Sequence, residues 1–343
     1  MKLKTVLLLS AAILLVAASC KKKEEETTYL SFVGSPEFTL PPFVEVGQTI
    51  SITPKAVTRA STDTETSEPG CYWTISQLAI RDTVRREGDP ASQSCSFSFG
   101  VPDSLQTLTV LCSRFADGYT NSSHSVNTIV VRTGNGYSSL QGFKYPEQRF
   151  TDTRDFRSYH YLTAAGMDWM AENLAYEGCG YSYFKCAVMD KLFGRFYTWN
   201  EAKSACPEGW RLPTNEEILA LTKAFTPEIA PASAKETFKN GAGRLMANGY
   251  FNASRLWEFW PDVTPVNTSG FSLLPLGYIS IQGEENNHLD VMKYAMFWTG
   301  DELDGDQAYF RSVYMKYDSI SCETGYKDYM ALNTRCVREH PAN

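Results

Sequence analysis

The sequence lacks the short motifs that mark the common catalytic and cofactor sites. It has no phosphate-binding loop, dinucleotide fingerprint, GxSxG elbow or HExxH helix. It also has no CxxC pair and no His/Cys spacing typical of a zinc site. Histidine is scarce, with 4 in 343 residues, and none stands in a motif that would activate a nucleophile. We therefore identify no catalytic residue and expect a protein that is not an enzyme.

The chain also lacks an excess of positive charge. Its 32 Lys and Arg residues against 39 Asp and Glu residues leave a formal net charge of −7 at pH 7. This balance argues against a general nucleic-acid binder or a binder of anionic membrane surfaces. With 43% hydrophobic residues, 343 residues are enough for two domains with cores of ordinary size.

An apolar run at the N-terminus is too short for an ordinary membrane span. Lys2 and Lys4 precede it, and it ends in "LVAASC", in which small residues lead to Cys20. This pattern resembles the lipobox of bacterial lipoproteins, which implies a signal peptide over residues 1–19 and a lipid on Cys20. The alternative is a plain signal peptide cleaved near Ala18.

The next segment, "KKKEEETT", completes a charged tether over residues 20–28. A lysine followed by acidic residues beside the lipid cysteine resembles the surface-export signal of Bacteroidota-type lipoproteins. We therefore expect a lipid-anchored protein of the outer membrane that faces the cell exterior.

Export makes disulfide bonds the natural use of cysteine. With Cys20 set aside from the 9 cysteines of the chain, eight remain, three in the first half and five in the second. The pairing of the first three and of Cys322 stays open at this point. Cys179 and Cys186 bracket the loop "CGYSYFKC" and are candidates for a local bridge. The first three cysteines are Cys71, Cys95 and Cys112.

Residues 29–133 consist of short strand-like segments separated by turns, without helical periodicity. Examples are "VEVGQTISITP", "CYWTISQLAI" and "VNTIVVRT". This pattern predicts an all-β sandwich of immunoglobulin type and weakly resembles PKD-like and bacterial Ig-like modules. The Gly/Ser-rich residues 134–142 are predicted to form a linker.

Residues 143–341 have a different character, with two predicted helices among strands and loops. One helix is expected from Trp199 to Ala205. The other begins at Thr214, where "TNEE" matches a capping box with Glu217, and Pro227 ends it.

Residues 150–338 carry five ordered blocks that resemble the Fibrobacter succinogenes major paralogous domain. The blocks include "WMAENL", "GRFYTWNEAKSACPEGWRLPTNEE", "GFSLLPLGY", "FWTGDE" and "RCVRE", although Phe156 stands where the family favours glycine. The resemblance implies an α+β fold of the C-type-lectin-like class. It also implies a disulfide between Cys206 and Cys336, with Trp210 and Leu212 in the core.

Two segments of this second domain are candidates for binding. The aromatic side chains of "SRLWEFWPDVTP" would grip a sugar or a protein if exposed, and a hydrophobic plug under a long loop is the alternative. The oxygen-rich "GDELDGDQ" suits calcium, and a polar turn is the alternative. The aromatic candidates are Trp257, Phe259 and Trp260, and the calcium candidates are Asp301, Glu302, Asp304 and Asp306.

These features together predict a non-enzymatic cell-surface lipoprotein that displays a lectin-like domain for glycan or protein binding and adhesion. No cofactor is expected unless the acidic segment holds calcium. A structural subunit of an outer-membrane surface complex is the first alternative. An enzyme on a C-type-lectin-like scaffold is the second, because a pair of catalytic carboxylates cannot be recognised from sequence.

Overall fold

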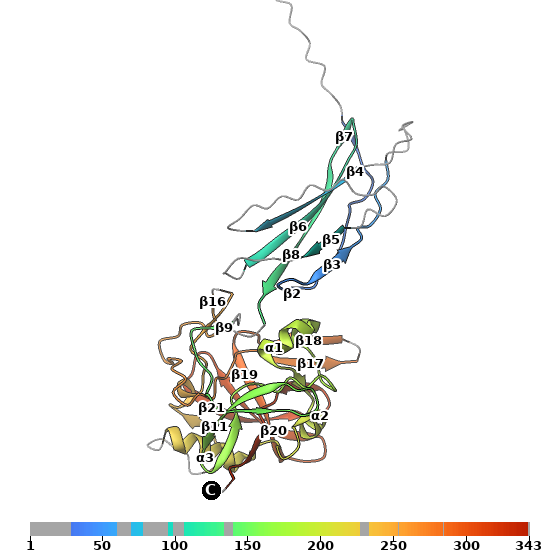
Figure 1. Ribbon diagram of the computed structural model, residues 1–343. Coiled ribbons are helices and arrows are strands. Elements are labelled where there is room, and N and C mark those ends of the chain that lie inside the picture. Colours follow the sequence, from blue (N-terminus) through green and yellow to red (C-terminus); the bar gives the residue numbers. More distant parts are fainter. Residues whose placement is uncertain are drawn as a thin grey trace, which may run out of the picture.

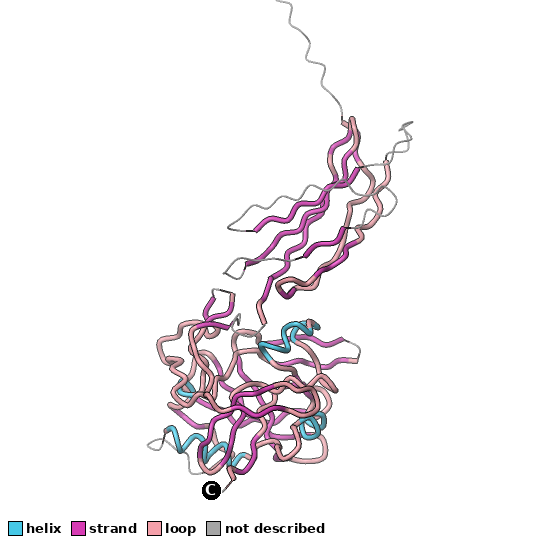
Figure 2. The backbone as a smooth tube through the Cα atoms, in the orientation of Figure 1, coloured by secondary structure: helices cyan, strands magenta, loops and turns pink. Residues whose placement is uncertain are grey.

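The computed structural model describes residues 29–59, 70–77, 95–98, 106–133, 140–226, 233–252, 254–283 and 285–341. Over this part of the chain the protein is mostly β-sheet with few helices, which appear as short segments in Figure 2. A narrow N-terminal β body is followed by a larger C-terminal body (Figure 1). None of the described helices is long and apolar enough to cross a membrane.

The described segments of the N-terminal body contain strands and no helix, as the strand-like segments predict. Its strands are β1 (Leu30–Ser31), β2 (Phe43–Glu45), β3 (Thr49–Ile52), β4 (Gly70–Gln77), β5 (Cys95–Ser98), β6 (Gln106–Phe115), β7 (Tyr119–Thr120) and β8 (Ser122–Val131).

A four-stranded sheet in the order β2-β8-β6-β4 forms most of this body, beside the β3-β5 and β1-β7 pairs. Alternate residues of β6 point to one face because side chains in a strand alternate. Leu108, Val110 and Cys112 are therefore buried together and pack around Trp73 of β4.

The C-terminal body contains three sheets. Its strands are β9 (Leu140–Gln141), β10 (Arg149–Thr151), β11 (Ser158–Ala164), β12 (Met167–Met170), β13 (Phe196–Tyr197), β14 (Phe238–Lys239), β15 (Tyr250–Phe251), β16 (Ser254–Arg255), β17 (Tyr278–Gln282), β18 (Glu285–Leu289), β19 (Tyr294–Glu302), β20 (Gln307–Tyr314), β21 (Ser319–Tyr326), β22 (Met330–Asn333) and β23 (Val337–Glu339).

The largest sheet has the order β14-β21-β20-β19-β22-β17-β18, with β13 added beside β22. A second sheet, β10-β11-β12-β23, joins the start of the body to its last strand. The third is β16-β15-β9. The order β19-β22-β17 brings segments together that are distant along the chain.

The α-helices of the described residues are α1 (Asp190–Phe193), α2 (Trp199–Ala205) and α3 (Asn215–Phe225), and short 3-10 turns accompany them. Both predicted helices are confirmed. The Thr214 hydroxyl accepts from the Glu217 N–H, and the Glu217 carboxylate accepts from the Thr214 N–H. Thr198 and Glu201 form the same capping box on α2, which the sequence reasoning did not identify.

Arg335 joins three distant segments in the core. Its guanidinium is fully buried and donates to the Asn173 side chain at 2.6 Å and to the backbone carbonyls of Phe271 at 2.6 Å and Ser272 at 2.9 Å. Burial lowers the pKa of Arg335 to about 10. The "WMAENL", "GFSLLPLGY" and "RCVRE" blocks therefore meet at one side chain, which gives them a structural role.

The junction between the two bodies differs from the predicted linker. Leu140 and Gln141, expected in the linker, form β9 and pair with Phe251 and Tyr250 of β15. The C-terminal body thus begins inside residues 134–142, because Leu140 is buried in its core.

Contacts also cross this junction directly. Phe43 of β2 packs against Tyr183, with ring centroids 5.8 Å apart, and belongs to the same core cluster. Glu45 of β2 forms an ion pair of 3.1 Å with Lys191 of α1, at the end of the C-terminal body that faces the N-terminal body (Figure 1). The ring contact of Phe43 with Tyr183 and this ion pair connect the two bodies.

Candidate functional site

A shallow groove on the C-terminal body is lined by two exposed tyrosines. Its volume is about 370 Å³ and its lining residues are Ser280, Ile281, Gln282, Tyr326 and Tyr329. Tyr326 is 54% exposed and Tyr329 is 64% exposed. A tyrosine ring exposed on this scale offers an apolar face and a hydroxyl to a ligand. We call this surface the tyrosine groove.

The tyrosine groove lies where three strands of the largest sheet end or pass. The Ile281 N–H of β17 donates to the Tyr329 carbonyl at 2.9 Å, which holds the residue before β22 against β17. Tyr326 is the last residue of β21. The two tyrosine rings have centroids 6.3 Å apart and stand at 79° to each other. The groove therefore presents two aromatic surfaces in different orientations.

Lys327 fixes the short turn that carries both tyrosines. Its side chain is buried, and its ammonium donates to the Glu302 carboxylate at 2.7 Å and to the carbonyls of Asp304 at 2.7 Å and Gly305 at 3.0 Å. The backbone of Lys327 also accepts from the Trp199 N–H at 3.1 Å. These bonds fix the backbone of the turn, and they therefore restrict the positions of the Tyr326 and Tyr329 rings that the turn carries.

Side chains of the acidic segment expected to hold calcium form hydrogen bonds with other groups of this chain. Asp301 accepts from the Asn215 N–H at 2.6 Å, at the first residue of α3. Asp304 accepts from the N–H groups of Asp306 and Gln307, both at 2.8 Å. The calcium site predicted at Asp301, Glu302, Asp304 and Asp306 stays a prediction. Of these four side chains, that of Glu302 pairs with the ammonium of Lys327.

The described residues also contain no group of three or more His, Cys, Asp or Glu side chains placed to hold a metal ion. The hydrogen bond and charge of Lys327 lower the pKa of Glu302. Oxygens from this segment thus serve a turn and a lysine, as the alternative of a polar turn expects.

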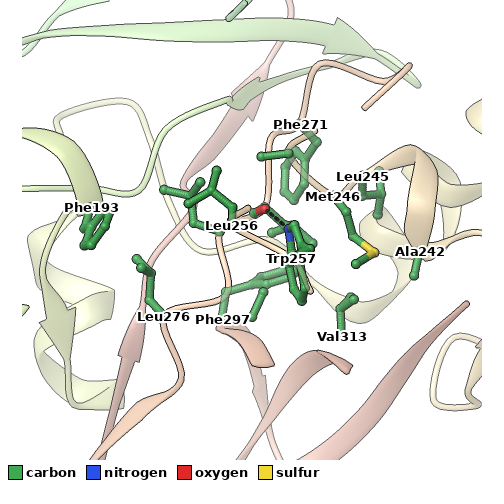
Figure 3. Packing of buried hydrophobic residues seen from close by; sticks show 14 of the residues in the cluster. Phe193, Ala242, Leu245, Met246, Leu256, Trp257, Phe271, Leu276, Phe297 and Val313 are labelled. Carbon is green, nitrogen blue, oxygen red and sulfur yellow. Dashed lines mark hydrogen bonds between the residues drawn. The ribbon is translucent and has the colours of Figure 1, made fainter. Parts of the chain in front are cut away.

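The predicted aromatic binding cluster is divided between core and surface. Trp257 is 3% exposed, and its indole N–H donates to the Leu273 carbonyl at 3.1 Å (Figure 3). Phe259 is 70% exposed. Trp260 is half-buried, and the Lys316 ammonium lies 4.2 Å from its ring centroid. The prediction of an exposed Trp257 is wrong, because the loop folds its indole into the hydrophobic core.

The cysteines of the C-terminal body form one bridge within the described residues. Cys206, directly after α2, and Cys336 are joined by a disulfide whose Cα atoms lie 5.9 Å apart. Trp210 and Leu212 are buried beside it in the same cluster. A disulfide-bonded Cys206 has no thiolate to act as a nucleophile.

The expected local bridge between Cys179 and Cys186 is not formed, and this prediction is wrong for the structure. Both are thiols. Cys186 is buried in one hydrophobic cluster, whereas Cys179 packs against the other. Burial raises the pKa of each thiol. Their positions in separate clusters keep the two sulfur atoms from pairing.

The predicted lipid anchor lies outside the described residues: it comprises Cys20, the leader over residues 1–19 and the tether over residues 20–28.

The tyrosine groove was not identified from the sequence. Its only local signal is "GYKDYM", in which two tyrosines flank a charged turn. That signal does not show that Ser280 and Gln282 lie beside the tyrosines, because β17 and β22 pair only in the folded sheet.

Comparison with known proteins shows one family match. A family model, the Fibrobacter succinogenes major domain, matches residues 162–338. No curated protein and no solved structure gives a significant match. The matched range contains α2, α3, the Cys206–Cys336 disulfide, Arg335 and every residue of the tyrosine groove.

Proposed function

The chain belongs to the Fibrobacter succinogenes major domain family over residues 162–338. We propose that it is a non-enzymatic surface protein that binds neutral saccharides. The tyrosine groove is the binding site, and the observation that carries the proposal is the pair of exposed, mutually tilted rings of Tyr326 and Tyr329. Aromatic faces stack on the apolar C–H faces of sugar rings, and tilted rings follow a curved saccharide chain.

The polar residues of the tyrosine groove support the same ligand. Ser280 and Gln282 place a hydroxyl and an amide beside the two rings, which suits the hydroxyl groups of a sugar. The five lining residues include no charged side chain. An uncharged ligand fits this lining, and none of the five side chains is a carboxylate that would bind calcium.

The size of the tyrosine groove favours a saccharide over a protein surface. A volume of about 370 Å³ falls within the roughly 300–1,000 Å³ of small-molecule sites. A stable protein interface buries about 1,200–2,000 Å² of total surface, which is much larger than five lining residues provide. A structural subunit of a surface complex, the alternative function, would need additional surface.

The proposal includes the finer architecture. The N-terminal body is a sandwich of the Ig/PKD-like type that raises the C-terminal body above the membrane, and the C-terminal body is C-type-lectin-like. The lipid on Cys20 and the charged tether anchor the protein on the outer membrane, facing the exterior. Two observations support these assignments. The N-terminal body has a four-stranded sheet beside the β3-β5 pair, and the C-terminal body is α+β with a disulfide next to its last strand.

Binding of the mature chain to an array of neutral and charged glycans tests the site. Each of Y326A and Y329A should weaken binding of the captured glycan by about 1 kcal/mol or more, since a stacked ring contributes about 0.5–1.5 kcal/mol beyond its buried area. Y326F and Y329F, which keep the rings, should retain most of the affinity. F259A removes an equally exposed ring elsewhere and serves as the matched control.

Two outcomes would overturn the saccharide proposal. One is an array on which the wild-type chain captures nothing, with and without chelator. The other is a glycan whose affinity is the same for wild type and for the Y326A/Y329A double variant. Capture of a protein that the double variant loses would favour the subunit alternative. Loss of acyl labelling in C20S tests the anchor independently of the groove.

A further inference from the structure

Two thiols meet in the core of the N-terminal body. The sulfur atoms of Cys71 on β4 and Cys112 on β6 lie 3.4 Å apart. Cys71 is 1% exposed and Cys112 is 0% exposed. Both belong to the hydrophobic cluster around Trp73, so the contact is part of the packed core.

The strand register places these sulfur atoms on one face of the sheet. In the antiparallel β4–β6 pair, Cys71 lies opposite Arg114 and Trp73 lies opposite Cys112. The two cysteines are therefore diagonal neighbours that point into the same core. From 3.4 Å, the sulfur atoms need to approach by only about 1.4 Å to reach the ~2.05 Å length of a disulfide.

A buried cation stands beside the pair. Arg114 is 1% exposed, and its Nε and Nη1 atoms have no hydrogen-bond partner among the described residues. A hydrogen bond from Cys112 lowers the pKa of Cys71 to about 7, and the charge of Arg114 acts in the same direction against the effect of burial. Once the two strands have paired, these contacts favour a Cys71 thiolate beside Cys112, which is the arrangement needed to close a disulfide.

We propose that Cys71 and Cys112 are an oxidative modification site that closes as a second disulfide of this protein. The oxidant is a disulfide of a small thiol or of a thiol oxidoreductase. The Cys71 thiolate attacks one sulfur of that disulfide, which forms a mixed disulfide and releases one thiolate. The Cys112 thiolate then attacks the Cys71 sulfur, forms the Cys71–Cys112 bond and releases the second thiolate.

The exchange balances. Each cysteine loses one proton and one electron, and the oxidant disulfide takes up the two electrons and two protons to become two thiols. Because both sulfur atoms are buried, the oxidant reaches them before the sandwich core has packed. The bond therefore forms during folding, and a chain folded in the reduced state is expected to react slowly.

Peptide mapping of the full mature chain tests the proposal without any variant. The chain is refolded with oxidised and reduced glutathione, alkylated in denaturant and digested without reductant. The expected result is a cross-linked peptide that contains Cys71 and Cys112, beside the Cys206–Cys336 peptide. Alkylation of Cys71 and Cys112 in that refolded chain would overturn the proposal.

Cys95 provides the competing result. Its backbone lies opposite Ile52 in the β3–β5 pair, and it is the remaining cysteine of residues 29–133. A cross-linked peptide from Cys95 to either Cys71 or Cys112 would also overturn the proposal.

The energetic effect gives a second, independent measurement. The bridge would close a chain segment with a sequence separation of 41. C71S/C112S should therefore raise the unfolding equilibrium constant of the oxidised chain roughly 10²–10³-fold in the chain-entropy model. The difference should largely disappear when wild type and variant are both unfolded in reductant. An equal difference under both conditions would show that serine disturbs packing and that no bond is lost.

Discussion

The ammonium of Lys327 lies 2.7 Å from the carboxylate of Glu302, beneath the turn that carries Tyr326 and Tyr329. The sequence places these two residues 25 positions apart. The acidic segment, which looks like a cation site in the sequence, binds the protein's own cation. This relationship connects the acidic segment to the groove proposed to hold a saccharide.

The first prediction concerns the anchoring role of Lys327. K327M should lower the free energy of unfolding by about 1.5–3 kcal/mol, because the carbonyls of Asp304 and Gly305 lose hydrogen bonds from a charged donor. Denaturant unfolding measures this change. The same variant should weaken saccharide binding, because the tyrosine turn is no longer fixed.

Lys203 is the matched control for Lys327. It lies 3.7 Å from the same Glu302 carboxylate, but both side chains of that pair are about half exposed. K203M should leave stability nearly unchanged, since exposed ion pairs contribute little. Equal effects of K327M and K203M would contradict the anchoring role.

The second prediction separates core from surface in the "LWEFW" segment. W257A should lower the free energy of unfolding by about 3–5 kcal/mol, because it leaves a cavity in the core and an unpaired Leu273 carbonyl. F259A should change it by less than about 0.5 kcal/mol, because the ring is exposed. Thermal or denaturant unfolding of both variants is the measurement. A small loss of unfolding free energy for W257A and a large loss for F259A would contradict this assignment, because Phe259 and not Trp257 would then lie in the core.

The third prediction concerns the Cys206–Cys336 disulfide, whose cysteines are 130 positions apart. C206S/C336S should destabilise the C-terminal body by about 4–5 kcal/mol in the chain-entropy model. C322S is the control, because Cys322 is a half-buried thiol and serine can keep its contact with the Asn215 side chain. If C206S/C336S unfolds at the same denaturant concentration as C322S and wild type, the bridge contributes no stability.

The fourth prediction is a pH dependence that arises from His288 on β18. Burial lowers the pKa of His288 from 6.5 to about 4, and the charge of Lys185 acts in the same direction. The imidazole Nε2 accepts from the Phe184 N–H at 2.9 Å and the ring stacks on Phe184. The folded chain therefore keeps His288 neutral where the unfolded chain protonates it.

Stability from this group is fully present above pH 6.5 and decreases as the pH falls from 6.5 towards 4. The slope is at most about 1.4 kcal/mol per pH unit for one proton. H288Q keeps an acceptor for the Phe184 N–H and does not titrate. Urea unfolding at several pH values should show a steeper loss for wild type than for H288Q, and parallel curves would contradict the assignment.

Much of the local structure follows from the sequence because its causes are local. The capping box of Thr214 and Glu217 sets the start of α3 through bonds between residues three positions apart. The alternation of Leu108 and Val110 in β6 determines which face of that strand is buried. The ordered motif blocks likewise identified the family from the sequence alone.

The site was decided by contacts that no local pattern contains. Trp257 and Phe259 stand two positions apart in the same polar-aromatic segment, yet one is in the core and the other is in solvent. Their exposure depends on what packs over the loop.

By itself, the sequence determined the strand-rich first body, the two capped helices and the family of the second body, because periodicity and capping act between near neighbours. Tertiary structure alone decided that Lys327 pairs with Glu302 and that Cys71 meets Cys112. It also placed Tyr326 and Tyr329 beside Ser280 and Gln282. These relationships arise where β20 joins β19 to β21, where β17 pairs with β22 and where β4 pairs with β6, since strand order brings together residues that are remote along the chain.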